Sequence, residues 1–264
     1  MVDPRTVLDD LRAESDEVDA LVSGPGERHW HDPTPAPGWT LAHQVAHLAW
    51  TDEQALLAAT DPDRFARLLE RAAADPGGFA DAEAARTADQ PRDRLLAAWR
   101  SGREALLEAL AAVPQGARMP WFGPPMSAAS MATGRLMEYW AHGQDVADAL
   151  GVHRVPTGRL WHVARLAVRA RDYAYFVHGE QPPAGEFRVE LAPPGGGEAW
   201  TYGPEDAEQR VTGPALDLCL LATRRRHRAD LGLKAEGADA DHWLDIAQSF
   251  AGPAGPGRTP GQFA

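Results

Sequence analysis

The sequence predicts a two-domain α+β protein, with a helical bundle in residues 1–152 and a mixed α+β domain in residues 153–264. In the first part, long segments repeat apolar residues at intervals of three and four, as helices with one buried face do. After Pro182-Pro183 the chain changes to short stretches in which apolar and polar residues alternate, which is typical of strands.

Four substantial helices are predicted in the first part, which suits a bundle; they cover residues 3–22, 40–59, 91–112 and 127–150. Their ends carry boundary residues. Asp3 and Thr40 are N-cap candidates, Pro4 suits a first helical position, and Gly151 stops the fourth helix. Shorter helices are expected in the stretches between, at residues 61–74 and 79–88.

The second part is expected to contain a small sheet. Alternation and turn residues predict strands at 187–191, 199–202, 211–212 and 231–235, and helices at 157–178, 214–225 and 238–250. The Pro-Gly turn at 193–197 joins the first two strands as a hairpin. The Gly/Pro-rich tail from Gly252 is predicted to be loose.

Composition excludes several classes of protein. Hydrophobic residues make up 44% and charged residues 24%, as in a globular protein with a core, and the net charge is −12. An acidic surface argues against a nucleic-acid partner. No apolar run is long enough to span a membrane, and the N-terminus lacks a signal-peptide core. The single cysteine, Cys219, suits the cytoplasm, and its apolar neighbours indicate a packing role.

Two predicted helices each carry a pair of potential metal ligands four residues apart, His43 with His47 and Glu138 with His142. Residues at this spacing share one helix face. If the helices face each other, three or four ligands can reach one ion, and a site of His and carboxylate with an open position is the catalytic kind. Both segments lie in or beside long uncharged stretches, which predicts that the ligands are buried and need partners.

Two plainer interpretations stay open at this point. His43 and His47 could be hydrogen-bonded core residues, and Glu138, His142 and Asp145 could form a solvated polar stripe. The spacing of His43 and His47 is also that of zinc proteases, but Gln44 stands where their motif requires a Glu as general base. A metalloprotease is therefore not expected.

A family resemblance bears on this choice. Pro37-Gly38-Trp39-Thr40, followed by Val45-Ala46-His47-Leu48, resembles the second-helix signature of the DinB-like superfamily, and within it the mycothiol-dependent maleylpyruvate isomerase family. That family pairs such a His with a later Glu-x3-His, which Glu138 and His142 match. The resemblance implies zinc, or another divalent metal such as nickel, held by His47, Glu138 and His142.

The resemblance also covers the second domain. Family members carry a C-terminal domain resembling sterol carrier proteins, and residues 211–218 are similar to its helix-entry motif. Some related proteins are labelled with wyosine base formation, which the acidic charge does not support. The family also implies an active arginine at the end of the 214–225 helix. The register favours Arg225, with Arg224 and Arg226 nearly as good.

Further roles follow for residues around the ligands. His43 is placed in the catalytic group as a cavity-lining residue, with a fourth-ligand or proton-shuttle role left open. Asp145 is either a surface residue or an acceptor that fixes a ligand imidazole. Trp39 and Trp140 are expected to bind a cofactor and, with Trp121 and Phe122, to line an apolar pocket unless they are core residues.

The expected function is thiol-dependent transfer or isomerisation of a small, anionic or enone-type substrate, with mycothiol as co-substrate. A metal-dependent hydrolase or lyase that uses no thiol is the first alternative. A metal- and ligand-binding protein without activity is the second. The protein is expected to be a monomer or homodimer.

Overall fold

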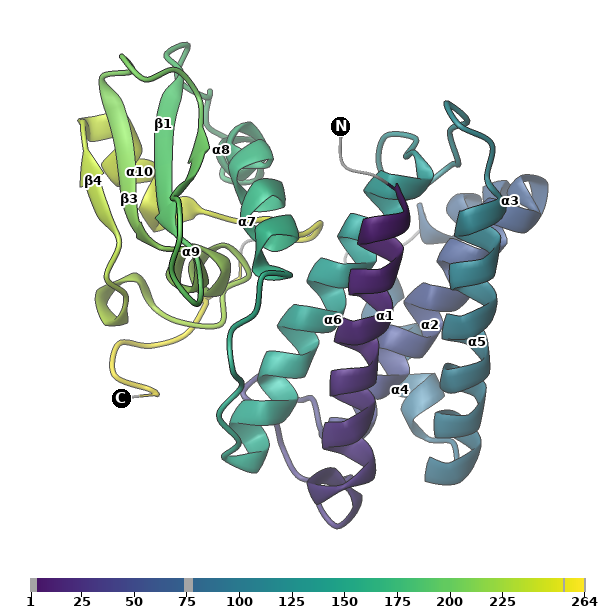
Figure 1. The fold of residues 1–264 in the computed structure, drawn as a ribbon. Coiled ribbons are helices and arrows are strands. Elements are labelled where there is room, and N and C mark those ends of the chain that lie inside the picture. The colour runs from purple at the N-terminus through teal and green to yellow at the C-terminus, as the bar shows by residue number, and fades with distance from the viewer. Residues whose placement is uncertain (1–3, 74–77, 254, 264) are drawn as a thin grey trace. The chain divides into compact units, whose positions relative to one another are not determined.

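The computed structural model describes residues 4–73, 78–253 and 255–263, and only the backbone of residues 4, 5, 80 and 81. The chain divides into two compact units, Met1–Arg154 and Val155–Ala264. The predicted N-cap Asp3 and the predicted helix end at Ala74 lie outside the described residues. The predicted fold class is confirmed, because the first unit is helical and the second combines a small sheet with helices (Figure 1).

The first unit is built on long helices that lie side by side (Figure 1). They are α1 (Pro4–Ser23), α2 (Leu41–Thr60), α3 (Pro62–Ala72), α4 (Phe79–Ala88), α5 (Arg92–Ala112) and α6 (Ala128–Leu150), with a short turn, η1 (Pro25–Glu27), after α1. Helix α2 packs against α4, α5 and α6, and α1 packs against α6. The four substantial helices predicted from the apolar spacing are α1, α2, α5 and α6.

Local residues fix where α6 begins, ends and meets α1. The Ser127 side chain caps its start by accepting a hydrogen bond from the Ser130 amide, and Gly151 ends it with φ of +63°. Gly143 lies at a close approach, since a Cβ there would come within 2.7 Å of the Val18 side chain. The glycine therefore lets α1 and α6 pack closely.

A buried polar network joins α2, α5 and α6. Arg135 Nε donates to Asp52 Oδ1 at 2.9 Å, Tyr139 donates its hydroxyl proton to the other Asp52 oxygen, and Trp99 Nε1 donates to the Tyr139 oxygen at 2.7 Å. Both charged side chains are 3% exposed or less. Burial raises the pKa of Asp52, although Arg135 and Tyr139 oppose that shift. Because buried charges are costly without partners, this network specifies how the three helices align.

The second unit contains a four-stranded sheet in the order β2-β1-β3-β4. Its strands are β1 (Phe187–Ala192), β2 (Trp200–Tyr202), β3 (Gln209–Pro214) and β4 (Lys234–Glu236). The predicted hairpin is present, since β1 and β2 pair antiparallel, and β1 also pairs parallel with β3, with Val189 opposite Val211. The helices of this unit are α7 (Leu160–Arg169), α8 (Arg171–Val177), α9 (Ala215–Ala222) and α10 (Ala238–Ile246), and a short turn, η2 (Arg228–Asp230), precedes β4.

Three predicted helices of this unit differ from the structure. The single helix expected at 157–178 is two, because Arg171 and Asp172 interrupt the apolar stripe and the bend at Ala170 turns Ala174 and Tyr175 into the core. The helix expected to reach residue 225 ends at Ala222. The helix expected to reach residue 250 ends at Ile246, and the Ser249 amide donates instead to the Ala222 carbonyl.

Two smaller predictions are settled by packing. The tail predicted to be loose is anchored, since the Gly261 amide donates to the Asp230 carboxylate and the Arg226 guanidinium lies 3.9 Å from the Phe263 ring centroid. Cys219 is buried, as its apolar neighbours predict, and burial raises the pKa of its thiol. Among the described residues, no helix is long and apolar enough to cross a bilayer.

Candidate metal centre

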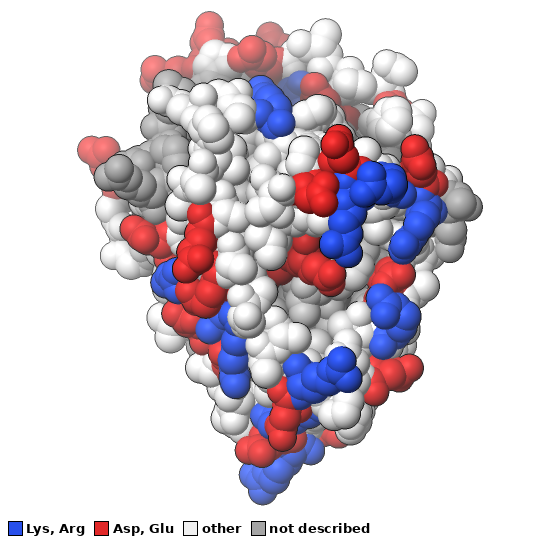
Figure 2. All heavy atoms as spheres, turned by 90° about the vertical axis from the view of Figure 1, so that its right-hand side faces the viewer, with Lys and Arg blue, Asp and Glu red and all other residues white. Residues whose placement is uncertain are grey.

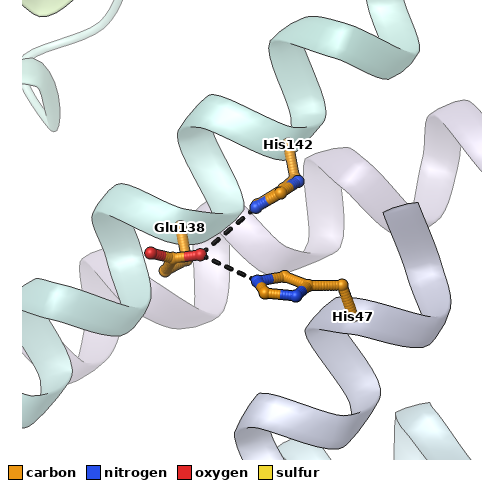
Figure 3. A group of neighbouring side chains, drawn as sticks. All are labelled: His47, Glu138 and His142. Carbon is orange, nitrogen blue, oxygen red and sulfur yellow. Dashed lines mark hydrogen bonds and ion pairs between the residues drawn. The ribbon is translucent and has the colours of Figure 1, made fainter. Parts of the chain in front are cut away.

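Two helices of the first unit bring three potential ligands together. His47 lies on α2, and Glu138 and His142 lie one turn apart on α6 (Figure 3). The Nε2 atoms of His47 and His142 lie 3.1 and 3.2 Å from the same carboxylate oxygen, Glu138 Oε2. One ligand atom from each residue falls within 4.8 Å of the others, so the group could hold one metal ion.

The three side chains are largely enclosed by the surrounding helices. His47 and His142 are 14% and 13% exposed, and Glu138 is 23% exposed. Asp145, one turn further along α6, is buried completely. The interpretation of Glu138, His142 and Asp145 as a solvated stripe is therefore wrong, and so is the surface alternative for Asp145.

The orientation of His142 is set by a chain of hydrogen bonds that reaches the loop before α2. His142 Nδ1 lies 2.5 Å from Gln44 Oε1, Gln44 Nε2 donates to Thr34 Oγ1 at 2.9 Å, and Thr34 Oγ1 donates to the Trp39 carbonyl at 2.9 Å. Because Gln44 donates through its nitrogen, its oxygen is the acceptor of the hydrogen bond from His142 Nδ1–H. A proton on Nδ1 leaves Nε2, the atom that faces Glu138, as the ring nitrogen that could bind a metal.

The sequence pattern predicts no role for Gln44 beyond the absence of a protease base. Its signal was its place one turn before His47 in an uncharged and therefore buried helix, where an amide must find partners. The candidate for fixing a ligand imidazole was Asp145, whereas Gln44 does so for His142.

The charge of Glu138 is stabilised by the two histidines. Burial by itself would raise the pKa of its carboxyl group, but the hydrogen bonds and charges of His142 and His47 hold that pKa well below its usual value. His47 Nδ1 is buried without a hydrogen-bond partner among the described residues. Two imidazoles and one carboxylate are the kind of ligand set found in zinc sites with an open coordination position.

Of the predicted aromatic wall, only Trp39 contacts the ligand rings. Its ring stacks on His142 at 5.8 Å between centroids and lies 5.3 Å from His47. Trp140 is buried. It lies two positions from each of the candidate ligands on α6, so it projects about 200° around the helix from both. The position of Trp140 therefore gives no support to its predicted role in binding a cofactor.

The predicted pocket of aromatic residues over the metal is not formed as a group. Trp121 stacks on Phe65 of α3 at 5.7 Å between ring centroids, and Phe122 contacts Phe65 and Trp50. These rings form a cluster between α2, α3 and the loop before α6, and no ring contact among the described residues links them to His47 or His142.

A family model covers the part of the chain that carries these three residues. The family model described as the mycothiol maleylpyruvate isomerase N-terminal domain matches residues 11–147, a range that contains His47, Glu138 and His142. The chain belongs to this family. A second model, described as wyosine base formation, matches residues 183–233 in the second unit.

Relatives and solved structures agree with this membership. Two curated proteins of Mycobacterium tuberculosis, from strains CDC 1551 / Oshkosh and ATCC 25618 / H37Rv, are 57% identical over 258 residues, covering 98% of this chain and all of theirs; both are described as uncharacterized. A crystal structure of the mycothiol-dependent maleylpyruvate isomerase has a TM-score of 0.62 at 16% identity, and a histidine-to-alanine mutant of it has 0.61 at 15%. Each alignment covers 89% of this chain and 93% of the other, which shows a shared fold.

In this family member, His43 stands apart from the three ligands. Its Nδ1 accepts a hydrogen bond from the Thr40 amide at 3.3 Å and lies 2.8 Å from the Thr40 hydroxyl, so the ring completes the cap at the start of α2. His43 does not belong to the group of residues that could hold a metal. This geometry supports a capping role and gives no support to a fourth ligand.

The arginine segment after α9, residues 224–226, belongs to the second unit. Its structure favours a different arginine from the predicted Arg225. Arg225 Nη1 donates to the Thr223 carbonyl at 2.6 Å. Arg224 is the one non-glycine residue with positive φ, +60°, among the described residues. Its Nε atom is buried without a partner there, and burial lowers the pKa of its guanidinium. Strain and an unpaired charge in one residue are typical of functional positions, so Arg224 is a stronger candidate for anion binding than the predicted Arg225.

Proposed function

We propose that this protein is a divalent-metal-dependent enzyme that catalyses a thiol-dependent transfer or isomerisation on a small, anionic or enone-type substrate. The observation that carries the proposal is the convergence of His47 Nε2 and His142 Nε2 on one Glu138 oxygen. Family membership adds the thiol and the reaction type, since the family is named for a mycothiol-dependent isomerase.

His47, Glu138 and His142 would hold the ion, and zinc and nickel both accept this set of ligands. A bound divalent ion lowers the pKa of a thiol or a water molecule and so makes it a nucleophile at neutral pH. Three protein ligands leave a position free, as catalytic sites require. Gln44 would keep His142 in the tautomer whose Nε2 can bind metal, and the Trp39 ring restricts the motion of both imidazoles.

The reacting thiol would come from outside the chain. Cys219 is buried, and burial raises the pKa of its thiol, so it is a poor nucleophile. A free low-molecular-weight thiol of the mycothiol type fits this requirement. Within the second unit, segment 224–226 offers guanidinium groups, which bind carboxylate with two parallel hydrogen bonds.

We infer no nucleic-acid substrate. The description of the second matching model concerns a modified base, but the net charge of −12 leaves little basis for attraction to a polyanion. We likewise expect a cytoplasmic protein whose two compact units act as domains.

The experiment that tests the function uses cobalt-substituted protein and mycothiol. Thiolate bound to cobalt(II) gives a charge-transfer absorption band, which water or a distant thiol does not give. We expect the band to appear with saturation in the wild type and to be absent in His142→Ala. Conversion of maleylpyruvate is then measured with and without mycothiol. Cobalt-loaded protein that shows no band would contradict the thiol-dependent function and favour a hydrolase or lyase.

A further inference from the structure

The first unit has a concave site on the face that carries α3. Helices α2, α3 and α4 surround a pocket of about 390 Å³. Its rim holds four arginines: Arg64, Arg67, Arg71 and Arg86. Figure 2 looks onto this face, where blue arginine side chains gather in the upper right of the view with red carboxylates between them. We call it the arginine pocket.

The arrangement of the rim follows from helical spacing. Arg64, Arg67 and Arg71 lie three and four residues apart on α3, so they share one face. Trp50 and Leu57 of α2 and Leu68 of α3 also line the pocket and give it apolar walls. The pocket therefore combines a cationic rim with apolar patches in its walls.

Two of the four arginines are already paired within the pocket. Glu83 lies 2.5 Å from Arg86 and 3.9 Å from Arg71. The side chains of Arg64 and Arg67 have no hydrogen bond or ion pair with any side chain that the structure describes. Among the described residues that line the pocket there are four arginines and two carboxylates, Glu53 and Glu83, which leaves an excess of positive charge in a chain of net charge −12.

These features point to a ligand with two parts. Guanidinium groups are planar donors that match carboxylate, sulfonate and phosphate oxygens. Apolar walls beside them suit a flat hydrocarbon body. We propose that the arginine pocket binds a small organic anion with an apolar or aromatic body, held at its charged end by Arg64 and Arg67.

This site is separate from the metal centre. None of the three candidate ligands lines the pocket. Trp50 follows His47 by one turn of α2, and Gln54, which also lines the pocket, lies roughly 10 Å along the helix axis from His47 at about 1.5 Å per residue. The inference therefore goes beyond the proposed function and does not depend on it.

The plainer interpretation is a solvated group of surface arginines, since exposed charges often contribute little. The test uses metal-loaded, full-length protein and the fluorescent anion 1-anilinonaphthalene-8-sulfonate, titrated at low ionic strength because salt screens exposed charges. The double variant Arg64→Gln/Arg67→Gln removes the two unpaired cations. The matched control, Arg94→Gln/Arg169→Gln, removes the same charge at two exposed positions outside the pocket.

We expect saturable binding to the wild type, a dissociation constant roughly tenfold or more higher in the pocket variant, and less than a twofold change in the control. Circular dichroism and metal content verify that each variant is folded. Equal binding by wild type and pocket variant, or no binding by the wild type, would overturn the proposal. Binding that persists in Glu138→Ala supports a site separate from the metal, whereas its loss there would contradict that separation.

Discussion

His142 Nδ1 on α6 lies 2.5 Å from Gln44 Oε1 on α2, and this contact links the helix that carries two candidate ligands to the helix that carries the third. Gln44 is buried completely and is held from its other side by Thr34. The amide therefore acts as a fixed acceptor that selects the His142 tautomer. At the same position of the zinc-protease motif a Glu serves as a general base. The Gln in this chain positions a histidine and does not take a proton.

The first prediction concerns this contact. Gln44→Met keeps the size of the side chain but removes the acceptor, so His142 loses its fixed tautomer. Metal affinity, measured by competition with a chromophoric chelator, should fall about 10- to 100-fold. Gln144→Met is the control, because Gln144 is also buried but donates to Asp148. Equal metal affinity in the Gln44 and Gln144 variants would argue against the positioning role.

The buried ion pair of Asp52 and Arg135 gives the second prediction. Asp52→Ala leaves a buried guanidinium unpaired and should lower the free energy of unfolding in urea by about 3–5 kcal/mol. Asp52→Leu/Arg135→Met removes both charges and should recover most of that loss. Glu104→Ala, which breaks the half-exposed pair with Arg12, should cost less than about 1 kcal/mol. If Asp52→Ala also lowers the free energy of unfolding by less than about 1 kcal/mol, the network does not specify the helix alignment.

Arg224 gives the third prediction, in which stability and activity move in opposite directions. Its backbone has φ of +60°, which glycine adopts without strain. Arg224→Gly should raise the free energy of unfolding by about 1 kcal/mol, while KM for an anionic substrate should rise roughly tenfold. Arg225→Gln should change both the free energy of unfolding and KM by less than Arg224→Gly does. If Arg225→Gln alone raises KM, the assignment from sequence is right and the choice of Arg224 is wrong.

The fourth prediction concerns the thiol of the chain itself. Burial raises the pKa of Cys219, which stabilises the protonated thiol, so the thiolate stays scarce in the folded protein as pH rises through the usual thiol range of about 8–9. Ellman's reagent should react slowly with native protein at about pH 8 and rapidly after unfolding in guanidinium. Cys219→Ala should keep any mycothiol-dependent activity. Rapid labelling of the native protein would instead indicate a reactive thiol in the chain.

Periodicity and boundary residues were sufficient to predict the main helices of the first unit. The expected helix at 79–88 coincides with α4, and Ser127 and Gly151 bound α6 as expected. The spacing of Glu138 and His142 placed both on one face of α6. What the pattern alone could not decide was whether α2 faces that side of α6, because this depends on packing between residues 91 positions apart, such as His47 and Glu138.

Other features depend on tertiary contacts that leave no local pattern. The break between α7 and α8 has no Gly or Pro and follows from where Ala174 and Tyr175 must face. His43 has the same residue type as His47, but its position three residues after Thr40 makes it a capping residue. Trp140 is apolar and close in sequence to both α6 ligands, yet the helical turn of two residues points it elsewhere.

The most direct test of the central claim is the metal content of protein purified without a histidine tag, measured by elemental analysis beside Glu138→Ala and His47→Ala. The proposed centre predicts about one zinc or nickel per wild-type chain and its loss in both variants, with the fold retained by circular dichroism. A wild type that binds no metal even after reloading, or variants that keep it fully, would contradict the assignment of His47, Glu138 and His142 as ligands.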